Sequence, residues 1–393
     1  MNDRKRFQQI GWKEHSLRHG DGSNGWLCEP AEHRFLHHQE GGWVLAFGLA
    51  QMDNGEVILL GAWEPVKGEK PHAVVAWSTD GGDMWSDFEA IPDAFQRPQL
   101  MAYLGAGNLA FSASEEQDNL AYFSSDYGRT WPERVPKQMA PNGRPLWGEG
   151  NPWVDRDAQG MATRVAMIGY NYVKGTWGAE PCDAFFCQSD DGARTWGEVI
   201  QPEAWRWQVD GEGKTWTRSI CEGSVIRARN GWLIAALRND LLPKFFPCHS
   251  DNFCGTGFSI SKDDGRTWSP FKQLFEAGRM HANLVLMPND DIVMTLIVRQ
   301  DIRDGKLASF RKGCDALVSH DNGLTWDLDR RYILDDWPYY DYTRPVPHAR
   351  AICGHSCSTL LEDGRILSAY GHYPAQGIGM IRWTPRLRSS GSA

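Results

Sequence analysis

Short apolar segments recur along the chain, and each is bounded by turn-forming Gly, Asn or Asp. Six of them are rich in Val, Ile, Leu and aromatic residues, at 55–63, 107–114, 163–171, 231–238, 291–299 and 364–372. Their length and composition are typical of strands and not of helices with a 3.6-residue period. A further apolar strand precedes each segment across a turn, so the pattern predicts six strand pairs from about residue 42 to about residue 385.

A polar turn motif, Ser-x-Asp-x-Gly-x-Thr-Trp, follows five of the six segments. Three copies match it in full and two diverge from it, at 124–131, 261–268 and 319–326, and at 78–85 and 189–196. In such a turn Asp bonds to the backbone, Gly supplies a positive φ, and Trp packs under the neighbouring strand. We therefore expect the acidic residues of the motif to be structural and not catalytic.

Strand pairs repeated in this way predict blades arranged around a central axis. The expected fold is an all-β, six-bladed β-propeller of four-stranded antiparallel blades, with residues 1–388 as one domain. Residues 389–393 resemble a linker or tag remnant and are left out of the fold prediction.

Composition narrows the possible partners. The chain has 393 residues, and 41 Lys and Arg against 50 Asp and Glu give a net charge of −9. This balance argues against nucleic acid or an anionic membrane as the main partner, and no apolar run approaches the ~20 residues that span a bilayer.

No apolar stretch follows residues 1–6, so a cytoplasmic location is expected for the chain as given, or export if a signal has been removed. The nine cysteines lack CxxC spacing and predict mostly free thiols.

The five turn motifs resemble the Asp box, or BNR repeat, of the sialidase (neuraminidase) superfamily. The resemblance covers most of the chain and implies a six-bladed propeller. It also implies an exo-acting glycoside hydrolase that needs no cofactor and releases a terminal acidic sugar, such as sialic acid, from a glycan. Because Asp boxes also occur in binding proteins and in other glycosidases, they indicate the fold more strongly than the function.

Polar residues at matching offsets in the strand pairs predict one central pocket, because the inner strands of a propeller converge on its axis. The positions counted back from each inter-strand turn are Arg97, Glu149 with Asn151, Glu222, His281 and His355. The far ends of the second strands are Glu64, Glu115, Glu116, Tyr172, Arg238 with Asp240, Arg299 and Tyr373. The expected pocket therefore contains arginines, carboxylates and histidines.

The segment around Glu222 resembles the sialidase segment in which a buried Glu precedes, by one hairpin, an arginine of the triad that binds the substrate carboxylate. The resemblance makes Arg238 that arginine, and Arg311 or Arg299 the third member of the triad. A guanidinium suits this role because it binds a carboxylate through two parallel hydrogen bonds. The alternatives are a structural Glu222–Arg238 pair and a salt bridge from Arg311 to Asp315.

The chain departs from the sialidase pattern near its start. The first inner strand contains no arginine, so Arg97 or Arg34 would have to replace the first member of the triad. The loop that holds the family's catalytic Asp contains no Asp here, and Glu64, Glu69 or His72 would have to donate the proton.

A further departure is His355, which stands where the family has its Tyr nucleophile. Beside Glu222, a histidine suits a general base that activates water, and this chemistry inverts the configuration in one step. Alternatively, His355 only binds the substrate while Tyr370 or Tyr373 acts.

Substrate binding is also expected for His281, Asp240 and Tyr373. No HExxH-type spacing supports a catalytic metal, so none is expected.

Three hypotheses remain: an exo-hydrolase for a terminal acidic sugar, a hydrolase or lyase for a uronate-bearing glycan in which His355 or His281 abstracts a proton, and a noncatalytic carbohydrate-binding propeller.

Overall fold

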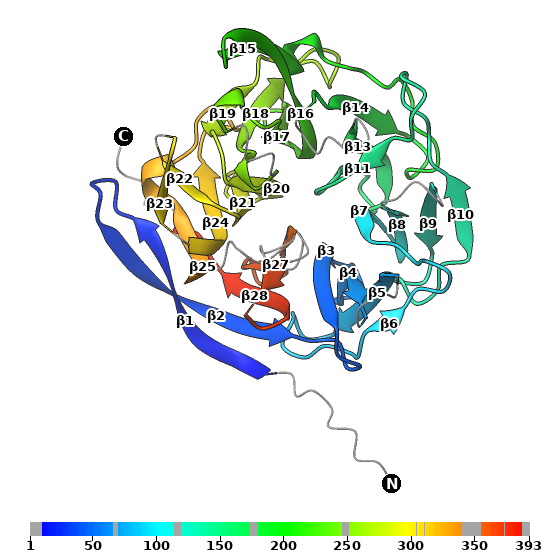
Figure 1. Ribbon diagram of the computed structural model, residues 1–393. Coiled ribbons are helices and arrows are strands. Elements are labelled where there is room, and N and C mark those ends of the chain that lie inside the picture. Colours follow the sequence, from blue (N-terminus) through cyan, green and yellow to red (C-terminus); the bar gives the residue numbers. More distant parts are fainter. Residues whose placement is uncertain are drawn as a thin grey trace.

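The computed structural model is a ring of β-sheets around a central axis (Figure 1). It describes residues 10–65, 70–113, 119–172, 180–245, 251–303, 305–309, 311–338, 355–372 and 374–386. Within these residues the helical elements are four 3-10 segments of one turn, η1 (Glu203–Trp205), η2 (Pro243–Phe245), η3 (Asp251–Phe253) and η4 (Leu328–Arg330). None of the described helices is long and apolar enough to cross a membrane.

The first three blades follow one another along the chain, each with its first strand nearest the axis. Blade 1 contains β3 (Trp43–Gln51), β4 (Val57–Glu64), β5 (His72–Ser78) and β6 (Glu89–Ala90). Blade 2 contains β7 (Pro98–Gly105), β8 (Asn108–Ala113), β9 (Leu120–Ser124) and β10 (Glu133–Pro136). Blade 3 contains β11 (Trp147–Gly148), β12 (Trp153–Arg156), β13 (Ala162–Asn171) and β14 (Asp183–Ser189).

Blades 4 to 6 carry the additions to this plan. Blade 4 contains β15 (Arg206–Gly211), β16 (Lys214–Arg227), β17 (Leu233–Asn239), β18 (Thr256–Ser261) and β19 (Lys272–Phe275). Blade 5 contains β20 (Arg279–Leu286), β21 (Ile292–Val298), β24 (Arg311–Ser319) and β25 (Tyr332–Pro338), and a separate hairpin joins β22 (Asp301–Arg303) to β23 (Lys306–Ser309). Blade 6 contains β26 (Ser356–Leu360), β27 (Ile366–His372) and β28 (Gly377–Trp383).

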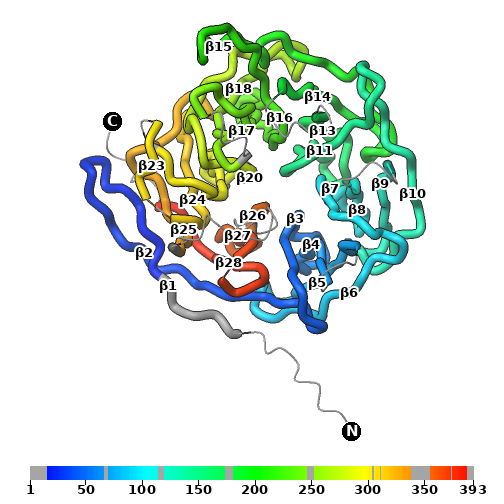
Figure 2. Tube along the Cα trace, in the orientation of Figure 1, coloured from blue at the N-terminus to red at the C-terminus, as the bar shows by residue number. Residues whose placement is uncertain are grey.

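An N-terminal hairpin closes the ring. Its strand β2 (Trp26–Leu36) pairs with β28 as the fourth strand of blade 6, and β1 (Ile10–Gly20) pairs with β25 of blade 5. Blades 5 and 6 therefore form one nine-stranded sheet. Figures 1 and 2 show the hairpin lying along the outer side of these two blades. The repeat pattern predicts strands only from about residue 42 and does not predict this hairpin.

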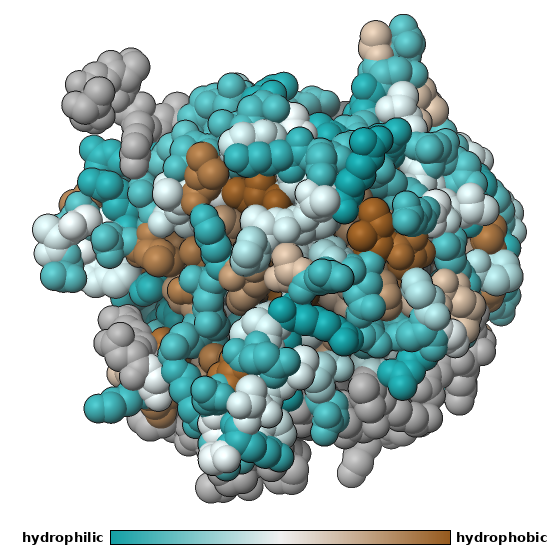
Figure 3. Space-filling view, turned by 90° about the horizontal axis from the view of Figure 1, so that it is seen from above, coloured by the Kyte–Doolittle hydropathy of each residue, from teal (hydrophilic) through white to brown (hydrophobic). Residues whose placement is uncertain are grey.

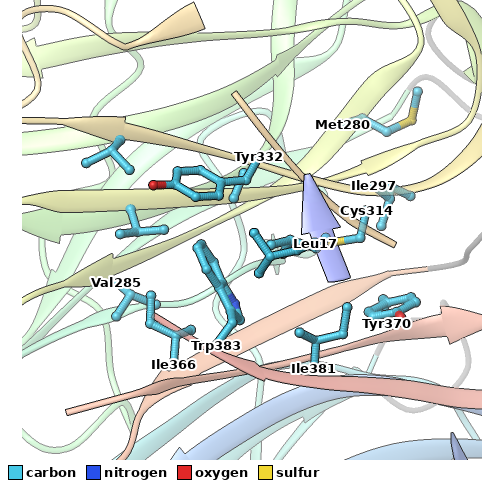
Figure 4. Packing of buried hydrophobic residues seen from close by; sticks show 14 of the residues in the cluster. Leu17, Met280, Val285, Ile297, Cys314, Tyr332, Ile366, Tyr370, Ile381 and Trp383 are labelled. Atoms are coloured by element: carbon cyan, nitrogen blue, oxygen red, sulfur yellow. The ribbon is translucent and has the colours of Figure 1, made fainter. Parts of the chain in front are cut away.

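The hydrophobic core lies between neighbouring blades. In Figure 4, Leu17 of the hairpin lies beside Tyr332 of blade 5 and Trp383 of blade 6, within one buried cluster. Because these side chains are fully or almost fully buried, the hairpin contributes to the core as well as to the sheet. From the side, hydrophilic residues cover most of the surface and hydrophobic residues form small separate groups (Figure 3).

The turn motif holds blades together, as its residues predict. In the copy at 124–131, Thr130 N donates to Asp126 Oδ1 (2.8 Å) and the buried Trp131 donates Nε1–H to Gly128 O (3.0 Å). Gly128 has φ +80°, and a Cβ there would lie 2.5 Å from Ile58 of blade 1. Glycine is favoured at this point because φ is positive and the turn packs directly against the preceding blade.

The all-β propeller of four-stranded antiparallel blades is therefore confirmed. The six predicted second strands correspond to β4, β8, β13, β17, β21 and β27.

Candidate functional site

Irregularities in the inner strands direct side chains toward the axis. The ladder skips residues between Ala46 and Gly48 in β3, between Pro98 and Met101 in β7, between Ile220 and Gly223 in β16, and between Met280 and Asn283 in β20. In blade 3 the inner strand is interrupted between β11 and β12, where Glu149 lies. In blade 6 the corresponding residue is His355, which directly precedes β26. A bulge re-aims a side chain without ending the sheet.

Each blade thereby contributes one or two residues to a shared pocket. The larger side chains are Phe47, Gln99, Glu149, Glu222, His281 and His355, and Gly150, Gly223, Ala282 and Ser356 complete the lining. The cavity between these side chains is small. His281 has φ +51°, a conformation that costs roughly 1–3 kcal/mol for a residue with a side chain. The surrounding structure holds His281 in this orientation toward the axis.

Glu149 is the centre of the polar network in the pocket. Its Oε1 contacts Nδ1 of His281 and lies 2.9 Å from Nδ1 of His355, and its Oε2 accepts a bond from Tyr170 Oη (2.9 Å). Gln99 Nε2 donates in turn to Tyr170 Oη (3.3 Å). Burial by itself raises the pKa of a carboxyl group, but the two histidines outweigh this and hold the pKa of Glu149 well below its ordinary value. Glu149 is therefore a carboxylate.

Arg299 determines which nitrogen of His281 carries the proton. Arg299 Nη2 donates to His281 Nε2 across 2.7 Å. Because arginine only donates, Nε2 accepts, and the proton of the neutral ring is on Nδ1, where it is donated to Glu149. Burial lowers the pKa of His281 to about 4, so the ring is neutral near pH 7. His281 therefore orients Glu149 and does not supply a base.

His355 is the more accessible of the two histidines. Its side chain is 16% exposed, against 4% for His281. The ring of His355 packs on the ring of Phe47 with 4.4 Å between the centroids. Its Nδ1 contacts Oε1 of Glu149. No described residue hydrogen-bonds to Nε2 of His355. A carboxylate on one imidazole nitrogen leaves the other available as a proton acceptor, which is the arrangement of a general base.

Glu222 forms a second acidic group beside the first. Its Oε2 accepts a bond from Arg238 Nη1 (2.5 Å), and its Oε1 accepts a bond from Tyr172 Oη. Oε2 also lies 3.6 Å from His281 Nδ1, so both carboxylates approach one imidazole. Burial opposes the charge on Arg238, but Glu222 keeps the pKa of Arg238 well above its ordinary value. Glu222 and Arg238 therefore form a buried salt bridge, which agrees with the structural alternative for these two residues.

Two of the predicted arginines lie away from the pocket. Arg97 donates Nε–H to Glu64 Oε1 (2.9 Å), and Gln99, two residues later, lines the pocket in its place. The bulge in β7 adds residues to the inner strand, and this moves the position that faces the axis.

Arg311 belongs to a buried ion network in blade 5. Its Nη2 lies 2.8 Å from Asp315 Oδ2, and Arg279 joins Asp315 (3.0 Å) to Asp301 (2.8 Å). This is the salt bridge named as the alternative for Arg311. Arg311, which was expected to bind the substrate carboxylate, instead binds the carboxylate of Asp315.

The remaining predicted residues have different outcomes. Asp240 is fully buried behind Glu222 and accepts a bond from Ser219 N (2.8 Å), so it does not line the pocket. Glu69 and Tyr373 lie outside the described residues, as do Glu115 and Glu116.

Sequence reasoning missed Phe47 and Gln99 as pocket residues. Neither has a titratable side chain, so a search for acids, bases and arginines passed over both. Their available signal is the position at the middle of an inner strand, which is shared with Glu222 and His281.

Glu149, His281 and His355 also have the residue types of a metal site, with ligand atoms within 4.8 Å of one another. A metal needs a lone pair on each ligand. Because Arg299 occupies Nε2 of His281 and the proton occupies Nδ1, His281 has no lone pair to offer. These residues do not fit a metal ion.

Comparison with known proteins identifies the fold. No protein-family model matches the chain, and no curated protein sequence matches it. The chain is similar to a protein of unknown function from Dyadobacter fermentans, with 16% identity, a TM-score of 0.62, and 90% and 98% of the two chains covered. It is also similar to an α-L-arabinanase from Penicillium chrysogenum, with 13% identity, a TM-score of 0.53, and 96% of this chain and 98% of that chain covered. An intramolecular trans-sialidase from Ruminococcus gnavus has 13% identity and a TM-score of 0.51, with 86% of this chain and 94% of that chain covered. At these identities the likeness supports the propeller fold and not an activity.

Proposed function

We propose that this protein is a carbohydrate-active enzyme, and specifically a glycoside hydrolase that releases a terminal acidic sugar from a glycan. The observation that carries the proposal is the Glu149–His355 pair, with 2.9 Å between Oε1 and Nδ1, at a pocket that also contains Glu222. The arabinanase and the trans-sialidase that share this propeller fold support carbohydrate as the substrate class.

In the proposed mechanism His355 Nε2 removes a proton from water, and Glu149 stabilises the imidazolium that forms. The water oxygen bonds to the anomeric carbon as the glycosidic bond breaks. The transition state has oxocarbenium character, and the carboxylate of Glu222, held in place by Arg238, stabilises its positive charge. Attack by water in a single step inverts the configuration.

The leaving oxygen needs a proton from a second acid. Glu64 lies at the end of β4 and is paired with Arg97. Because the Glu64 carboxylate is already bound by Arg97, the proposed donor is Glu69, which follows on the same loop and lies outside the described residues.

Arg97 supports an acidic sugar as the substrate. Its side chain is 35% exposed, and it uses Nε and Nη2 to bind Glu64. Its Nη1 has no hydrogen bond to a described residue, so it is available to a substrate carboxylate.

A second candidate function is a lyase for a uronate-bearing glycan. Both pocket carboxylates accept hydrogen bonds from Arg, His or Tyr, so neither of these described groups is placed to donate a proton to a leaving group. Elimination begins with removal of the proton next to the uronate carboxyl group, and His355 is suited to this step.

The test is a panel of sialosides and uronate-containing oligosaccharides incubated with the purified chain. Hydrolysis releases a free sugar acid, whereas elimination leaves an unsaturated product that absorbs in the ultraviolet. We expect release of the sugar acid, with His355→Ala and Glu149→Gln lowering kcat about 10²–10⁴-fold. Full activity in both variants, or no product from any substrate, would contradict the proposal.

A matched control is available in the same fold. His320 has a similar carboxylate contact, with Nδ1 2.7 Å from Asp291 Oδ1, but it lies in the outer turn motif of blade 5. His320→Ala should leave kcat unchanged.

A further inference from the structure

Two thiols and a carboxylate meet in the core directly behind Glu222. Cys182 lies just before β14, Cys221 lies in β16, and Asp240 follows β17. Their Sγ and carboxylate oxygen atoms lie within 4.8 Å of one another, and all three residues are fully buried. Neither cysteine forms a disulfide.

Asp240 gives an independent sign that a ligand belongs there. Its Oδ2 accepts bonds from Ser219 N (2.8 Å) and Cys182 N (3.4 Å). Its Oδ1 is buried and has no hydrogen-bond partner among the described residues. A buried carboxylate oxygen without a donor is costly, and buried acids normally pair with a donor or a cation.

We propose that Cys182, Cys221 and Asp240 bind one zinc ion. Thiolate and carboxylate are both ordinary zinc ligands, with bonds of about 2.3 Å to sulfur and about 2.0–2.2 Å to oxygen. Tetrahedral ligands at these distances lie about 3.3–3.8 Å apart, which the cluster reaches with small side-chain movements. The Cys182 thiol donates a hydrogen bond to the carbonyl oxygen of Asn171 (3.2 Å), and its proton is one of the two that zinc binding would displace.

The charges of the surroundings suit this ion. Two thiolates and one carboxylate around Zn²⁺ leave a net charge of −1, and binding releases the two thiol protons. Arg218 and Arg238 both act electrostatically on Asp240, so positive charge already faces the cluster. Arg218 is itself 1% exposed. The negative charge of a zinc-thiolate centre in this position would therefore face the guanidinium of Arg218.

The ion would also support the pocket. Cys221 immediately precedes Glu222 in the bulge of β16, and Tyr172 Oη lies 3.7 Å from Cys221 Sγ while it bonds to Glu222. Zinc would hold Cys221 in place and with it the orientation of Glu222. The binding site itself does not depend on the proposed hydrolase activity.

The experiment begins with the metal content of the full-length chain, expressed with added zinc and then dialysed against a chelator. We expect about one zinc per chain. Cobalt exchanged for zinc should give a thiolate-to-metal charge-transfer band, and a thiol-modifying reagent should release the metal. These measurements need no variant, so they hold even where a substitution prevents folding.

Variants then locate the site. Cys182→Ala, Cys221→Ala and Asp240→Asn should each lower zinc content at least about tenfold. The matched controls are Cys187→Ala and Cys357→Ala, because both thiols are buried but belong to neither ligand cluster. The proposal is overturned by a zinc-free chain with no cobalt band, by zinc content that the three variants leave unchanged, or by a Cys182–Cys221 disulfide in non-reducing peptide mapping.

Discussion

Glu149 and His355 come from blades 3 and 6 and meet at the axis, with 2.9 Å between Oε1 and Nδ1. The carboxylate lies between two histidines, of which only His355 has a partly exposed ring. The contact joins parts of the chain that are distant in sequence, so it exists only when the ring of blades is complete.

Replacing Glu149 by Gln should abolish most activity without unfolding the chain. Gln keeps the shape and the bond from Tyr170, but it removes the charge that stabilises a protonated His355. We expect kcat to fall about 10²–10⁴-fold with KM almost unchanged. Steady-state kinetics beside circular dichroism check this, and a rise in KM alone would show that Glu149 binds substrate instead.

Removing Arg238 should destabilise the fold. Arg238→Met leaves Glu222 as a buried charge without its counter-ion, which costs about 3–5 kcal/mol. The double variant Glu222→Gln with Arg238→Met should recover part of this loss, because no buried charge remains uncompensated. Urea unfolding of the four proteins measures the coupling, and strictly additive losses would show that the two residues do not stabilise each other.

Arg311 should affect stability and not substrate binding. Arg311→Met breaks its contact with Asp315, whereas the pocket lining is unchanged. Asp315→Asn should be the more damaging change, by about 3–5 kcal/mol, because it leaves Arg279 and Arg311 without their shared carboxylate. Denaturation and kinetics on an acidic substrate check both variants. A tenfold rise in KM for a fully folded Arg311→Met protein would restore its predicted role as a carboxylate ligand.

The protein should lose stability in mild acid. Burial lowers the pKa of His38, His281 and His372 to about 4 in each case. The unfolded chain binds these protons near pH 6.5, so stability is complete above that pH and falls as the pH drops toward 4. Each histidine accounts for at most about 3 kcal/mol.

Urea unfolding between pH 7.5 and pH 4.5 measures this loss. The variant His38→Gln should be less stable at every pH, since the ring stacks on Trp63 at 4.0 Å, but its dependence on pH should be shallower. An unchanged slope would exclude His38 as a source of the acid sensitivity.

The turn motifs should matter for stability alone. Asp126→Ala removes the bonds to Thr130 N and Thr130 Oγ1 and should cost about 1 kcal/mol, with kcat unchanged. Thermal unfolding and kinetics check this. Loss of activity at full stability would contradict the structural role of the motif.

The sequence by itself determined the strands and turns. Alternating apolar segments and turn residues act locally, and the six predicted second strands correspond to strands in the structure. The Ser-x-Asp-x-Gly-x-Thr-Trp turns were equally predictable, because their hydrogen bonds join residues within eight positions. The offsets also brought Glu149, Glu222, His281 and His355 together before any geometry was known.

Tertiary structure alone decided which side chains face the axis and which arginines are already paired with a carboxylate of the protein. A bulge of one or two residues replaces Arg97 by Gln99 at the pocket, and register shifts of this kind leave no mark on the apolar pattern. Asp315 occupies Arg311 from within blade 5, and the N-terminal hairpin closes the ring through β28. These outcomes depend on pairing between distant segments, whose geometry is set by packing across blades and not by local residue preference.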